Sequence, residues 1–405
     1  MSDAAIRPRL NWFSPLPPSR TDVAHFALRS LPSLAQHFDI TVWTERPFSP
    51  SGLDSYAYAR MWEGEPWAAL NVADVTVYHI GNNARFHGWI WDVAQRHPGV
   101  VVLHDTGLRE FLTAHLRHDE EEVSRLVEIG ATAATLERAR GAVVHSSAAF
   151  EHVAPLRRCP VVQLELPYPA GRPVVARGWD GVLRLVVFGF LGSNRRLESL
   201  LDAMATFPDR ARLRLDIFGE LEHGDAVAER IQSHALTDIV SVRGFVKEAG
   251  LDEALDRSHL AVNLRFPSMG EASASQLRIW DRGLASVVTR TGWYAELPAD
   301  TVWYVDPDNE VADLHRHFAA ALADPGTLQA MGAAGRRHLE ARHDPRVYAR
   351  ELAAAIAQMV KTPAPIAGDA IGAVSRILGD ARISGSAKAA VARRIGEEVA
   401  RWVGP

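Results

Sequence analysis

The sequence predicts an α/β fold built from two successive doubly wound domains. Three observations support this prediction: the chain has 405 residues, short β-rich runs alternate with longer helical stretches, and the alternation starts again after a segment rich in proline and glycine. A chain of that length is too long for one hydrophobic core and suits two domains. Continuous β-branched runs bounded by turns indicate parallel strands that are buried on both faces.

The first half of the chain contains six predicted strands. They are expected at residues 10–13, 40–43, 75–80, 100–104, 142–145 and 161–164. A helix is predicted over residues 22–36, directly after the first strand. Residues 167–178 are rich in Pro, Gly and Arg and are typical of a linker.

The second half repeats the pattern. Strands are expected at residues 183–188, 213–218, 240–242, 260–264, 286–289 and 302–305, and helices at 311–323, 326–342 and 345–360. We therefore expect two Rossmann-like domains, at residues 1–170 and 181–344, that face each other across a cleft. The helix near residues 345–360 is expected to rejoin the first domain. Residues 361–405 are expected to form a helical tail that packs on the body or mediates self-association as a homo-oligomer.

The composition excludes several classes of protein. With 47% hydrophobic and 23% charged residues the chain is an ordinary globular protein. A formal net charge of -5 and a pI near 6.4 provide no basic surface, so nucleic acid is not an expected partner. The single cysteine, Cys159, excludes an internal disulfide framework and a cysteine-cluster metal site. The N-terminus lacks the apolar run of a signal peptide and no transmembrane segment is expected, so the predicted location is cytoplasmic.

An acidic residue at the start of a predicted helix is the most informative feature of the chain. Glu271 follows a strand and a Pro-Ser-Met-Gly turn that ends at Gly270. The first helical turn is expected to consist of Ala272, Ser273, Ala274 and Ser275. Unpaired N–H groups in such a turn favour an anion, and a carboxylate accepts hydrogen bonds from hydroxyls. A ligand that has both a phosphate and neutral hydroxyls, such as a nucleotide-sugar, therefore suits the helix turn and Glu271 together. The alternative interpretation is that Glu271 only complements the helix dipole and Ser273 caps the helix.

A glycine-rich turn follows the first strand of the second domain and leads into a helix. Gly189 and Gly192 allow a ligand to approach the backbone closely. The residues Ser193, Arg195 and Arg196 follow, and the two guanidinium groups match the geometry of phosphate. The alternative is a tight turn with two solvated arginines.

Polar residues also follow the strands of the first domain. His104 and Asp105 end a strand, where a histidine can bond a sugar hydroxyl or assist proton movement, or the two residues can be merely structural. The loop after the first strand contains Pro18 and is stiffened by prolines. Thr21 or Asp22 can cap the helix that follows this loop.

Taken in order, these segments resemble the motifs of glycosyltransferase family 4, a retaining family with the GT-B fold. The resemblance covers about residues 10–360. It lies in Ser14-Pro15-Leu16-Pro17-Pro18, Val102-Leu103-His104-Asp105, Phe188 to Arg196, Asp216-Ile217-Phe218-Gly219-Glu220, Val242-Arg243-Gly244-Phe245-Val246 and Gly270-Glu271.

The resemblance implies roles for individual residues. His104 would lie by the donor sugar, Arg195 would take the basic position at the diphosphate, and Glu271 would contact hydroxyls of the transferred sugar. The implied donor site comprises Gly189, Gly192, Ser193, Arg195, Arg196, Gly244, Phe245 and residues 270–275. Catalytic roles are expected for His104, Arg195 and Glu271.

The chain also departs from the family's pattern. Ile279 stands where the second Glu of the Glu-x7-Glu motif binds the ribose, and Phe190 replaces a basic residue. Asp22 replaces the usual glycine of the opening loop and would repel a pyrophosphate. We therefore assign that loop, with Pro18, Thr21 and Asp22, to the acceptor. Asn82 and Asp105, which follow two other strands of the first domain, are also expected to contact the acceptor.

The expected function is transfer of a hexose-type sugar, with retention, from a nucleoside-diphosphate sugar to a hydroxyl acceptor. UDP is favoured over GDP, and the acceptor is a glycan, a lipid-linked molecule or a small molecule. No metal or other cofactor is expected, because guanidinium groups and the helix dipole would take the place of a metal. Two alternatives remain: a non-catalytic GT-B nucleotide-binding or regulatory subunit, and a GT-B-fold sugar-nucleotide epimerase.

Overall fold

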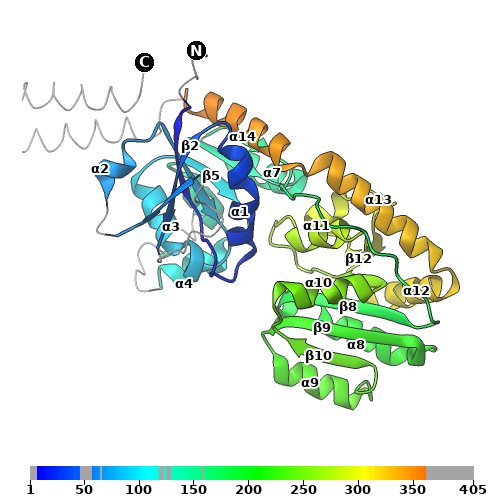
Figure 1. The fold of residues 1–405 in the computed structure, drawn as a ribbon. Coiled ribbons are helices and arrows are strands. Elements are labelled where there is room, and N and C mark those ends of the chain that lie inside the picture. The colour runs from blue at the N-terminus through cyan, green and yellow to red at the C-terminus, as the bar shows by residue number, and fades with distance from the viewer. Residues whose placement is uncertain are drawn as a thin grey trace, which may run out of the picture. The chain divides into compact units, whose positions relative to one another are not determined.

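The computed structural model describes residues 7–45, 57–63, 66–117, 123–124, 129–156 and 159–361 of the chain. These residues form two compact units (Figure 1). The first comprises the described residues as far as Leu164 and those from Arg346 onward, and the second is Glu165–Pro345. Residues 362–405 lie outside the described residues, and with them the predicted helical tail and its role in self-association. No helix in the described ranges is both long and apolar enough to cross a membrane.

Within its described residues the first unit contains a seven-stranded parallel sheet. The strand order is β3-β2-β1-β4-β5-β6-β7. The strands are β1 (Arg9–Phe13), β2 (Asp39–Thr44), β3 (Ala57–Met61), β4 (Val75–Ile80), β5 (Val100–Leu103), β6 (Gly141–Val144) and β7 (Val161–Gln163). Strand β3 was not predicted. It lies at the edge of the sheet, and its sequence Ala-Tyr-Ala-Arg-Met lacks the β-branched residues that mark the other strands.

Helices cover both faces of this sheet. They are α1 (Asp22–Leu34), α2 (Trp67–Leu70), α3 (Ala84–Arg96), α4 (Arg109–His115), α6 (Ala131–Leu136), α7 (Ser147–Val153) and α14 (Pro345–Met359). On one face the stacked rings of Phe13 and Trp43 pack in a core that includes residues of α3. On the other, Phe26 of α1 meets Tyr348 of α14, with ring centroids 5.7 Å apart. The C-terminal helix is therefore a structural part of the first unit.

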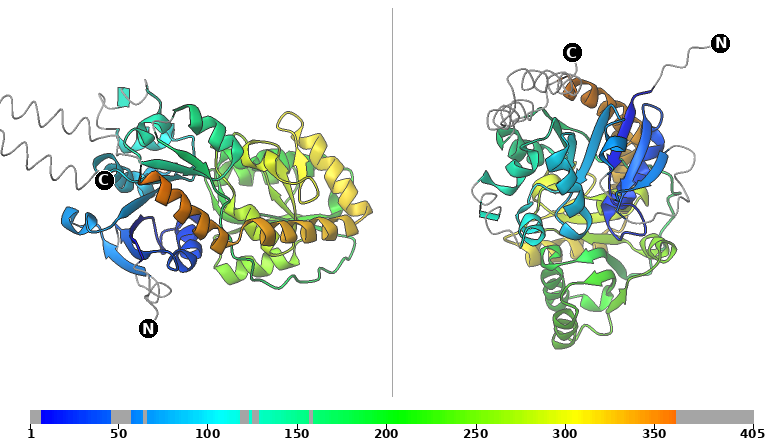
Figure 2. Two further views of the ribbon diagram at one scale, coloured as in Figure 1. Left: turned by 90° about the horizontal axis from the view of Figure 1, so that it is seen from above. Right: turned by 90° about the vertical axis from the view of Figure 1, so that its left-hand side faces the viewer.

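The second unit contains a six-stranded parallel sheet with the order β10-β9-β8-β11-β12-β13. The strands are β8 (Leu183–Leu191), β9 (Leu213–Leu221), β10 (Val240–Gly244), β11 (Leu260–Asn263), β12 (Ala285–Thr289) and β13 (Trp303–Val305). The helices are α8 (Leu197–Thr206), α9 (Gly224–Ser233), α10 (Glu248–Arg257), α11 (Ala274–Asp281), α12 (Glu310–Ala323) and α13 (Gly326–Arg342). Figure 2 shows helices on both faces of this sheet. One buried core includes residues of α8 and α12, and the other includes residues of α10 and α11.

Two paired glycines explain why β8 and β9 extend beyond their predicted ends. Gly189 pairs with Gly219, and their φ angles are +111° and +118°. A Cβ on Gly219 would lie 1.9 Å from the carbonyl oxygen of Gly189, so only glycine fits there. The two strands therefore approach closely at this pair and continue to Leu191 and Leu221.

The predicted linker is fastened to the second unit. The N–H of Gly171 donates to Oδ1 of Asp281 at 3.0 Å, and Nη2 of Arg177 donates to the carbonyl of Arg282 at 2.9 Å. Its residues have no helix or strand, but they follow the surface around the end of α11. The segment is therefore a fixed edge of this unit.

Candidate functional site

The turn after β8 holds a buried arginine at the carboxyl end of the sheet. A short 3-10 helix, η2 (Ser193–Arg195), begins after Gly192, whose carbonyl accepts the N–H of Arg195 at 2.9 Å. The Arg195 side chain is buried, and its Nη2 donates to the carbonyl of Phe188 at 3.1 Å. A guanidinium is rarely buried unless partners stabilise its charge. The turn therefore places a fixed positive charge where parallel sheets bind their ligands.

The neighbouring Arg196 is held differently. It adopts a left-handed conformation, with φ 54°, and its guanidinium pairs with the buried carboxylate of Glu310. Nε lies 2.8 and 3.0 Å from the two carboxylate oxygens, and Nη2 lies 2.8 Å from one of them. These hydrogen bonds to Glu310 raise the pKa of Arg196. The sequence assigns both arginines to the diphosphate, whereas in the structure Arg196 fastens the turn to the start of α12.

The Glu271 carboxylate is buried and held from two sides. Its Oε2 accepts the N–H of Met269 at 2.6 Å and the hydroxyl of Ser268 at 3.2 Å. Its Oε1 lies 3.0 Å from Nε of Arg265 as an ion pair. Oε1 is buried, yet among the described residues it accepts no hydrogen bond of acceptable geometry. One carboxylate oxygen thus fixes the loop, and the other retains capacity for a hydroxyl donor.

The loop that carries Glu271 is bonded to the arginine turn. The N–H of Phe266 donates to the carbonyl of Asn194 at 2.8 Å, and the N–H of Arg265 donates to Oγ1 of Thr289 at 2.9 Å. Ser268 packs against Gly292, where a Cβ would lie 2.6 Å from its Oγ. The structure therefore brings together the two segments that the sequence assigns to the donor.

Helix α11 begins two residues later than predicted. Ser273 is the N-cap, and its Oγ accepts the N–H of Gln276 at 3.1 Å. Ala272 consequently precedes the helix, and Gly270, with φ +80°, forms the turn before it. Ser273 thus caps the helix, as the alternative interpretation of this segment expected, and is not part of the first helical turn. The N–H groups of Ala274 and Ser275, in the first turn, have no carbonyl partner within the helix.

Residues predicted to surround the nucleotide base lie at the same carboxyl end of the sheet. Gly244 ends β10 with φ +64°, and the side chain of Phe245 is 63% exposed. Phe190, near the end of β8, is equally exposed. Ile279, which stands at the position of the second Glu of the motif, is fully buried in a hydrophobic core. Its side chain is thus unavailable to a ribose.

In the first unit, His104 follows β5 and lies among other histidines. Its main-chain N–H donates to the carbonyl of Ile80 at 2.8 Å, and its Nε2 lies 2.9 Å from Nδ1 of His79. The rings of Phe26 and His145 lie 4.8 and 5.5 Å from its own. Burial, followed by the neighbouring histidines, lowers the pKa of His104 well below its usual value of 6.5. The ring is therefore neutral near pH 7, so it can form a hydrogen bond with a hydroxyl but carries no positive charge to pair with an anion.

Asn82 and Asp105 lie together beside this histidine cluster. The Asp105 carboxylate accepts the N–H of Asn82 at 2.7 Å, and the side-chain oxygen of Asn82 accepts the N–H of Phe111 at 3.1 Å. These hydrogen bonds join the turn before α3 to the start of α4. Both side chains, which the sequence assigns to the acceptor, therefore have structural hydrogen bonds as well.

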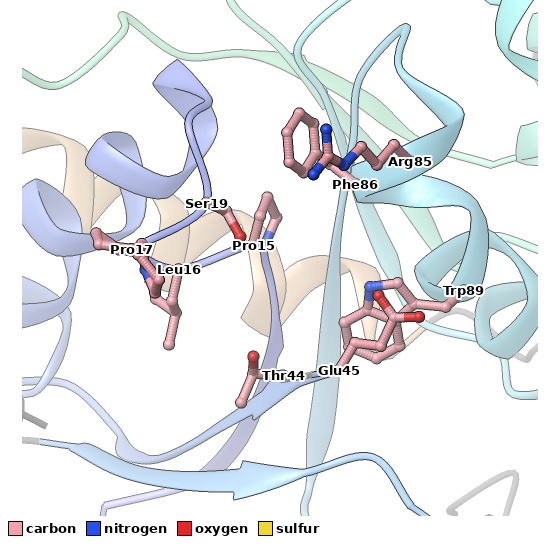
Figure 3. Close-up of a pocket in the computed structure, with 10 residues that line it drawn as sticks. Pro15, Leu16, Pro17, Ser19, Thr44, Glu45, Arg85, Phe86 and Trp89 are labelled. Carbon is pink, nitrogen blue, oxygen red and sulfur yellow. The ribbon is translucent and has the colours of Figure 1, made fainter. Parts of the chain in front are cut away.

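The loop after β1 forms one wall of a pocket (Figure 3). The lining residues are Pro15, Leu16, Pro17, Pro18, Ser19, Thr44, Glu45, Arg85, Phe86 and Trp89. Thr21 caps α1 by accepting the N–H of Val23 at 3.4 Å, and Asp22 occupies the first helical turn. Of the predicted acceptor residues, only Pro18 lines the pocket.

Sequence reasoning gave no role to Arg265 or to the pocket residues Phe86 and Trp89. Arg265 lies just after a buried strand in the same loop as Glu271, which is a usable signal. The aromatic residues belong to α3, where their spacing of three places them on one helix face. His79 lies near the end of β4, at the same edge of the sheet as Asn82, but nothing in the sequence indicates that it bonds His104.

Comparisons with known proteins identify the fold. No protein-family model matches the sequence, and no curated protein sequence matches it either. Among solved structures, the chain is similar to Alr3699/HepE of Anabaena in complex with UDP and glucose, with a TM-score of 0.66 and 12% identity over 87% of this chain and 100% of that one. Sucrose-phosphate synthase from Thermosynechococcus elongatus gives a TM-score of 0.65 and 15% identity over 87% and 99% of the two chains. WaaG, a glycosyltransferase involved in lipopolysaccharide biosynthesis, gives a TM-score of 0.58 and 13% identity over 86% and 99%. With its two parallel sheets and flanking helices, the chain has the GT-B fold of two Rossmann-like domains.

Proposed function

We propose that the protein is a retaining glycosyltransferase that moves a hexose-type sugar from a UDP-sugar to a hydroxyl acceptor. The observation that carries this proposal is the hydrogen bond from the N–H of Phe266 to the carbonyl of Asn194. It joins the turn of the buried Arg195 to the loop of the buried Glu271. A guanidinium, which suits an anion, and a carboxylate, which suits hydroxyls, are thus carried by two bonded segments, and this supports binding of a nucleotide-sugar.

The second unit would bind the donor. Arg195 and the N–H groups of Ala274 and Ser275 would meet the diphosphate, since guanidinium groups and helix N-termini both favour phosphate. Oε1 of Glu271 would accept a hydrogen bond from a sugar hydroxyl. The exposed ring of Phe245 would lie against the base. UDP is favoured over GDP because the similar HepE structure holds UDP.

The proposed reaction breaks the bond between the anomeric carbon and the phosphate oxygen and forms a bond from the acceptor oxygen on the same face. The departing phosphate oxygen takes the acceptor's proton, and UDP leaves. Fixed positive groups stabilise the charge that develops on the diphosphate, an effect that contributes several kcal/mol in other enzymes. His104, being neutral, would bond a hydroxyl of the transferred sugar.

The acceptor would be bound by the first unit. The pocket of Figure 3 combines the rings of Phe86 and Trp89 with the carboxylate of Glu45. Aromatic faces pack against the apolar face of a sugar or a lipid-linked glycan, and a carboxylate accepts hydrogen bonds from hydroxyls. Glycan, lipid-linked and small-molecule acceptors therefore all belong in a first screen.

Substituting Arg195 tests the donor assignment. Arg195→Met keeps an apolar stem in the buried site but removes the charge, so UDP affinity is expected to fall about tenfold, the equivalent of one charge-assisted hydrogen bond. Titration calorimetry with UDP measures the change. The control is Arg184→Met, near the opposite end of β8, where an exposed arginine pairs with Asp180. Equal UDP affinity in Arg195→Met and the wild type would contradict the phosphate assignment.

A non-catalytic subunit that binds a nucleotide is the second candidate. The observation that favours it is the buried Ile279, which removes one carboxylate contact to the ribose. Incubation with UDP-glucose distinguishes the two functions. The enzyme breaks the bond between glucose and the diphosphate and releases UDP, whereas a binding subunit leaves UDP-glucose intact. An epimerase would change the sugar of the donor in the absence of any acceptor, which chromatography of the recovered sugar detects.

A further inference from the structure

The side chains of His79 and His104 form a hydrogen-bonded pair inside the first unit. Nδ1 of His79 lies 2.9 Å from Nε2 of His104, and the two rings stack with centroids 5.2 Å apart. His79 belongs to β4 and stands opposite Val102 of β5, the strand that His104 follows. The register of two neighbouring strands therefore places the pair.

Among the described residues, the ring of His79 has one hydrogen-bonding partner, His104. The side chain is fully buried, with the ring of Trp12 at 4.1 Å and that of Phe26 at 5.3 Å. Its second ring nitrogen, Nε2, makes no hydrogen bond to any described residue. Its main chain is anchored, because Nδ1 of His87 bonds the His79 carbonyl at 3.0 Å. Aromatic rings therefore surround the His79 ring, and its Nδ1 faces His104.

The hydrogen bond between the two rings determines which nitrogen of each ring carries the proton. Burial, followed by neighbouring histidines, lowers the pKa of His79 and of His104 well below 6.5, so both rings are neutral near pH 7. A neutral imidazole carries one N–H and one lone pair. The hydrogen bond between the rings needs one of each, so the tautomer of one ring determines that of the other.

We propose that His79 is a positioning residue that holds His104 in one orientation and one neutral tautomer for sugar transfer. With Nε2 bound to His79, the nitrogen that remains for a substrate hydroxyl is Nδ1 of His104, and its protonation is fixed in advance. This inference rests on the proposed function, which gives His104 its role beside the donor sugar. His79 touches His104 and no reacting atom, so its effect on the reaction is indirect.

Two substitutions at His79 test the proposal. His79→Leu fills the apolar site but removes the hydrogen bond, whereas His79→Asn places an amide near the position of Nδ1. With UDP-glucose, kcat is expected to fall about ten- to a hundredfold in His79→Leu, as expected for a misplaced group near the reacting centre. His79→Asn is expected to recover most of this loss. KM and UDP affinity are expected to stay within about twofold in both variants, because only the orientation of His104 changes.

Spectra of the histidine rings provide a readout that does not depend on turnover. In protein labelled with ¹⁵N-histidine, the His104 signals are assigned by their loss in His104→Gln. They are expected to show one neutral tautomer in the wild type and a mixture in His79→Leu. The pH profile of kcat is expected to shift its acid limb to higher pH in His79→Leu, since His79 contributes to the lowered pKa of His104.

Three results would overturn the positioning role. They are wild-type turnover in His79→Leu, a mixture of His104 tautomers in the wild type, or equal losses in both variants with an unchanged pH profile, which would indicate packing alone. A wild-type protein that turns over no nucleotide-sugar would instead contradict the proposed function. In that case the ring spectra still decide whether His79 sets the tautomer.

Discussion

The two units use different chemistry at the carboxyl ends of similar parallel sheets. In the second unit the candidate groups are charged: Arg195 is buried beside β8, and Glu271 is paired with Arg265. In the first unit two neutral rings, His104 and His79, bond each other within an aromatic shell, and the one carboxylate described beside them, Asp105, accepts a main-chain N–H. Fixed charges suit a ligand whose own charge is fixed, such as a diphosphate, whereas neutral rings suit hydroxyls. Under the proposed function, the second unit would recognise the anion and the first unit would bond hydroxyls, with Glu271 as the exception.

Glu271→Gln tests that exception and should have the largest effect. The amide keeps the size of the side chain but loses the charge that pairs with Arg265, so turnover of UDP-glucose is expected to fall about a hundredfold, or close to 3 kcal/mol in the barrier. UDP affinity should stay unchanged, because UDP lacks the transferred sugar whose hydroxyls Glu271 is proposed to bond. Initial rates and calorimetry measure the two quantities.

The matched control for this substitution is Glu229→Gln. Glu229 is an exposed residue of α9 in the same unit and is not part of the loop or of the arginine turn. It should leave both quantities near wild-type values. Full turnover in Glu271→Gln would remove Glu271 from the donor site and restore its interpretation as a helix-dipole partner.

Arg196→Met separates two adjacent arginines that the sequence treats alike. It leaves the Glu310 carboxylate buried without its cation, so the second unit should lose about 2 kcal/mol of stability, less than for a fully buried pair because Arg196 is 35% exposed. UDP affinity should hardly change, in contrast to Arg195→Met. Urea unfolding and calorimetry on both variants make the comparison. A loss of UDP affinity in Arg196→Met equal to that in Arg195→Met would assign both arginines to the phosphate.

Local patterns in the sequence predict elements better than they predict partners. Strand β4 and helix α13 match their predicted ranges, 75–80 and 326–342, because a continuous apolar run marks the strand and helical spacing marks the helix. The start of α11 was placed two residues early, since Ala272 and Ala274 are equally good helix formers and only the side-chain bond of Ser273 selects the cap.

Contacts between distant residues explain what the sequence could not predict. Arg196 and Glu310 are 114 residues apart, and His79 and His104 are 25 apart. Each pair exists because sheet order and helix packing bring the residues together, and no spacing rule identifies such partners. Their places after predicted strands singled out His104 and Glu271, and the resemblance to a family gave them roles, but the groups that hold them became visible only in the structure.

His87→Asn tests how a buried neutral histidine of the first unit contributes to the pH dependence of stability. Burial lowers the pKa of His87 from 6.5 to about 4. The unfolded chain therefore takes up a proton at higher pH than the folded unit does, so stability is complete above about pH 6.5 and declines as the pH falls toward 4. An asparagine amide retains a donor for the His79 carbonyl but does not titrate. The wild type loses free energy of unfolding between pH 7.5 and pH 5, and in the variant this loss should be about 1–2 kcal/mol smaller.

Urea unfolding at the two pH values measures this difference. His152→Asn, at an exposed position on α7, is the control and should retain the wild-type pH dependence. The same pH dependence in His87→Asn as in the wild type would show that His87 does not contribute to the acid sensitivity of this unit.

Removal of divalent metal should have the smallest effect on turnover. It tests whether the charges of the second unit alone neutralise the diphosphate. Arg195 and the N-terminus of α11 are proposed to neutralise the diphosphate, a task that a metal ion performs in other enzymes. UDP release from UDP-glucose should therefore stay within about twofold when EDTA is added, as expected when no metal ion contributes to the barrier. Titration with Mg²⁺ or Mn²⁺ is the complementary measurement. If EDTA abolishes turnover and Mn²⁺ restores it, the charge of the donor site is incomplete without a cation, and the contrast between a charged and a neutral unit must include that ion.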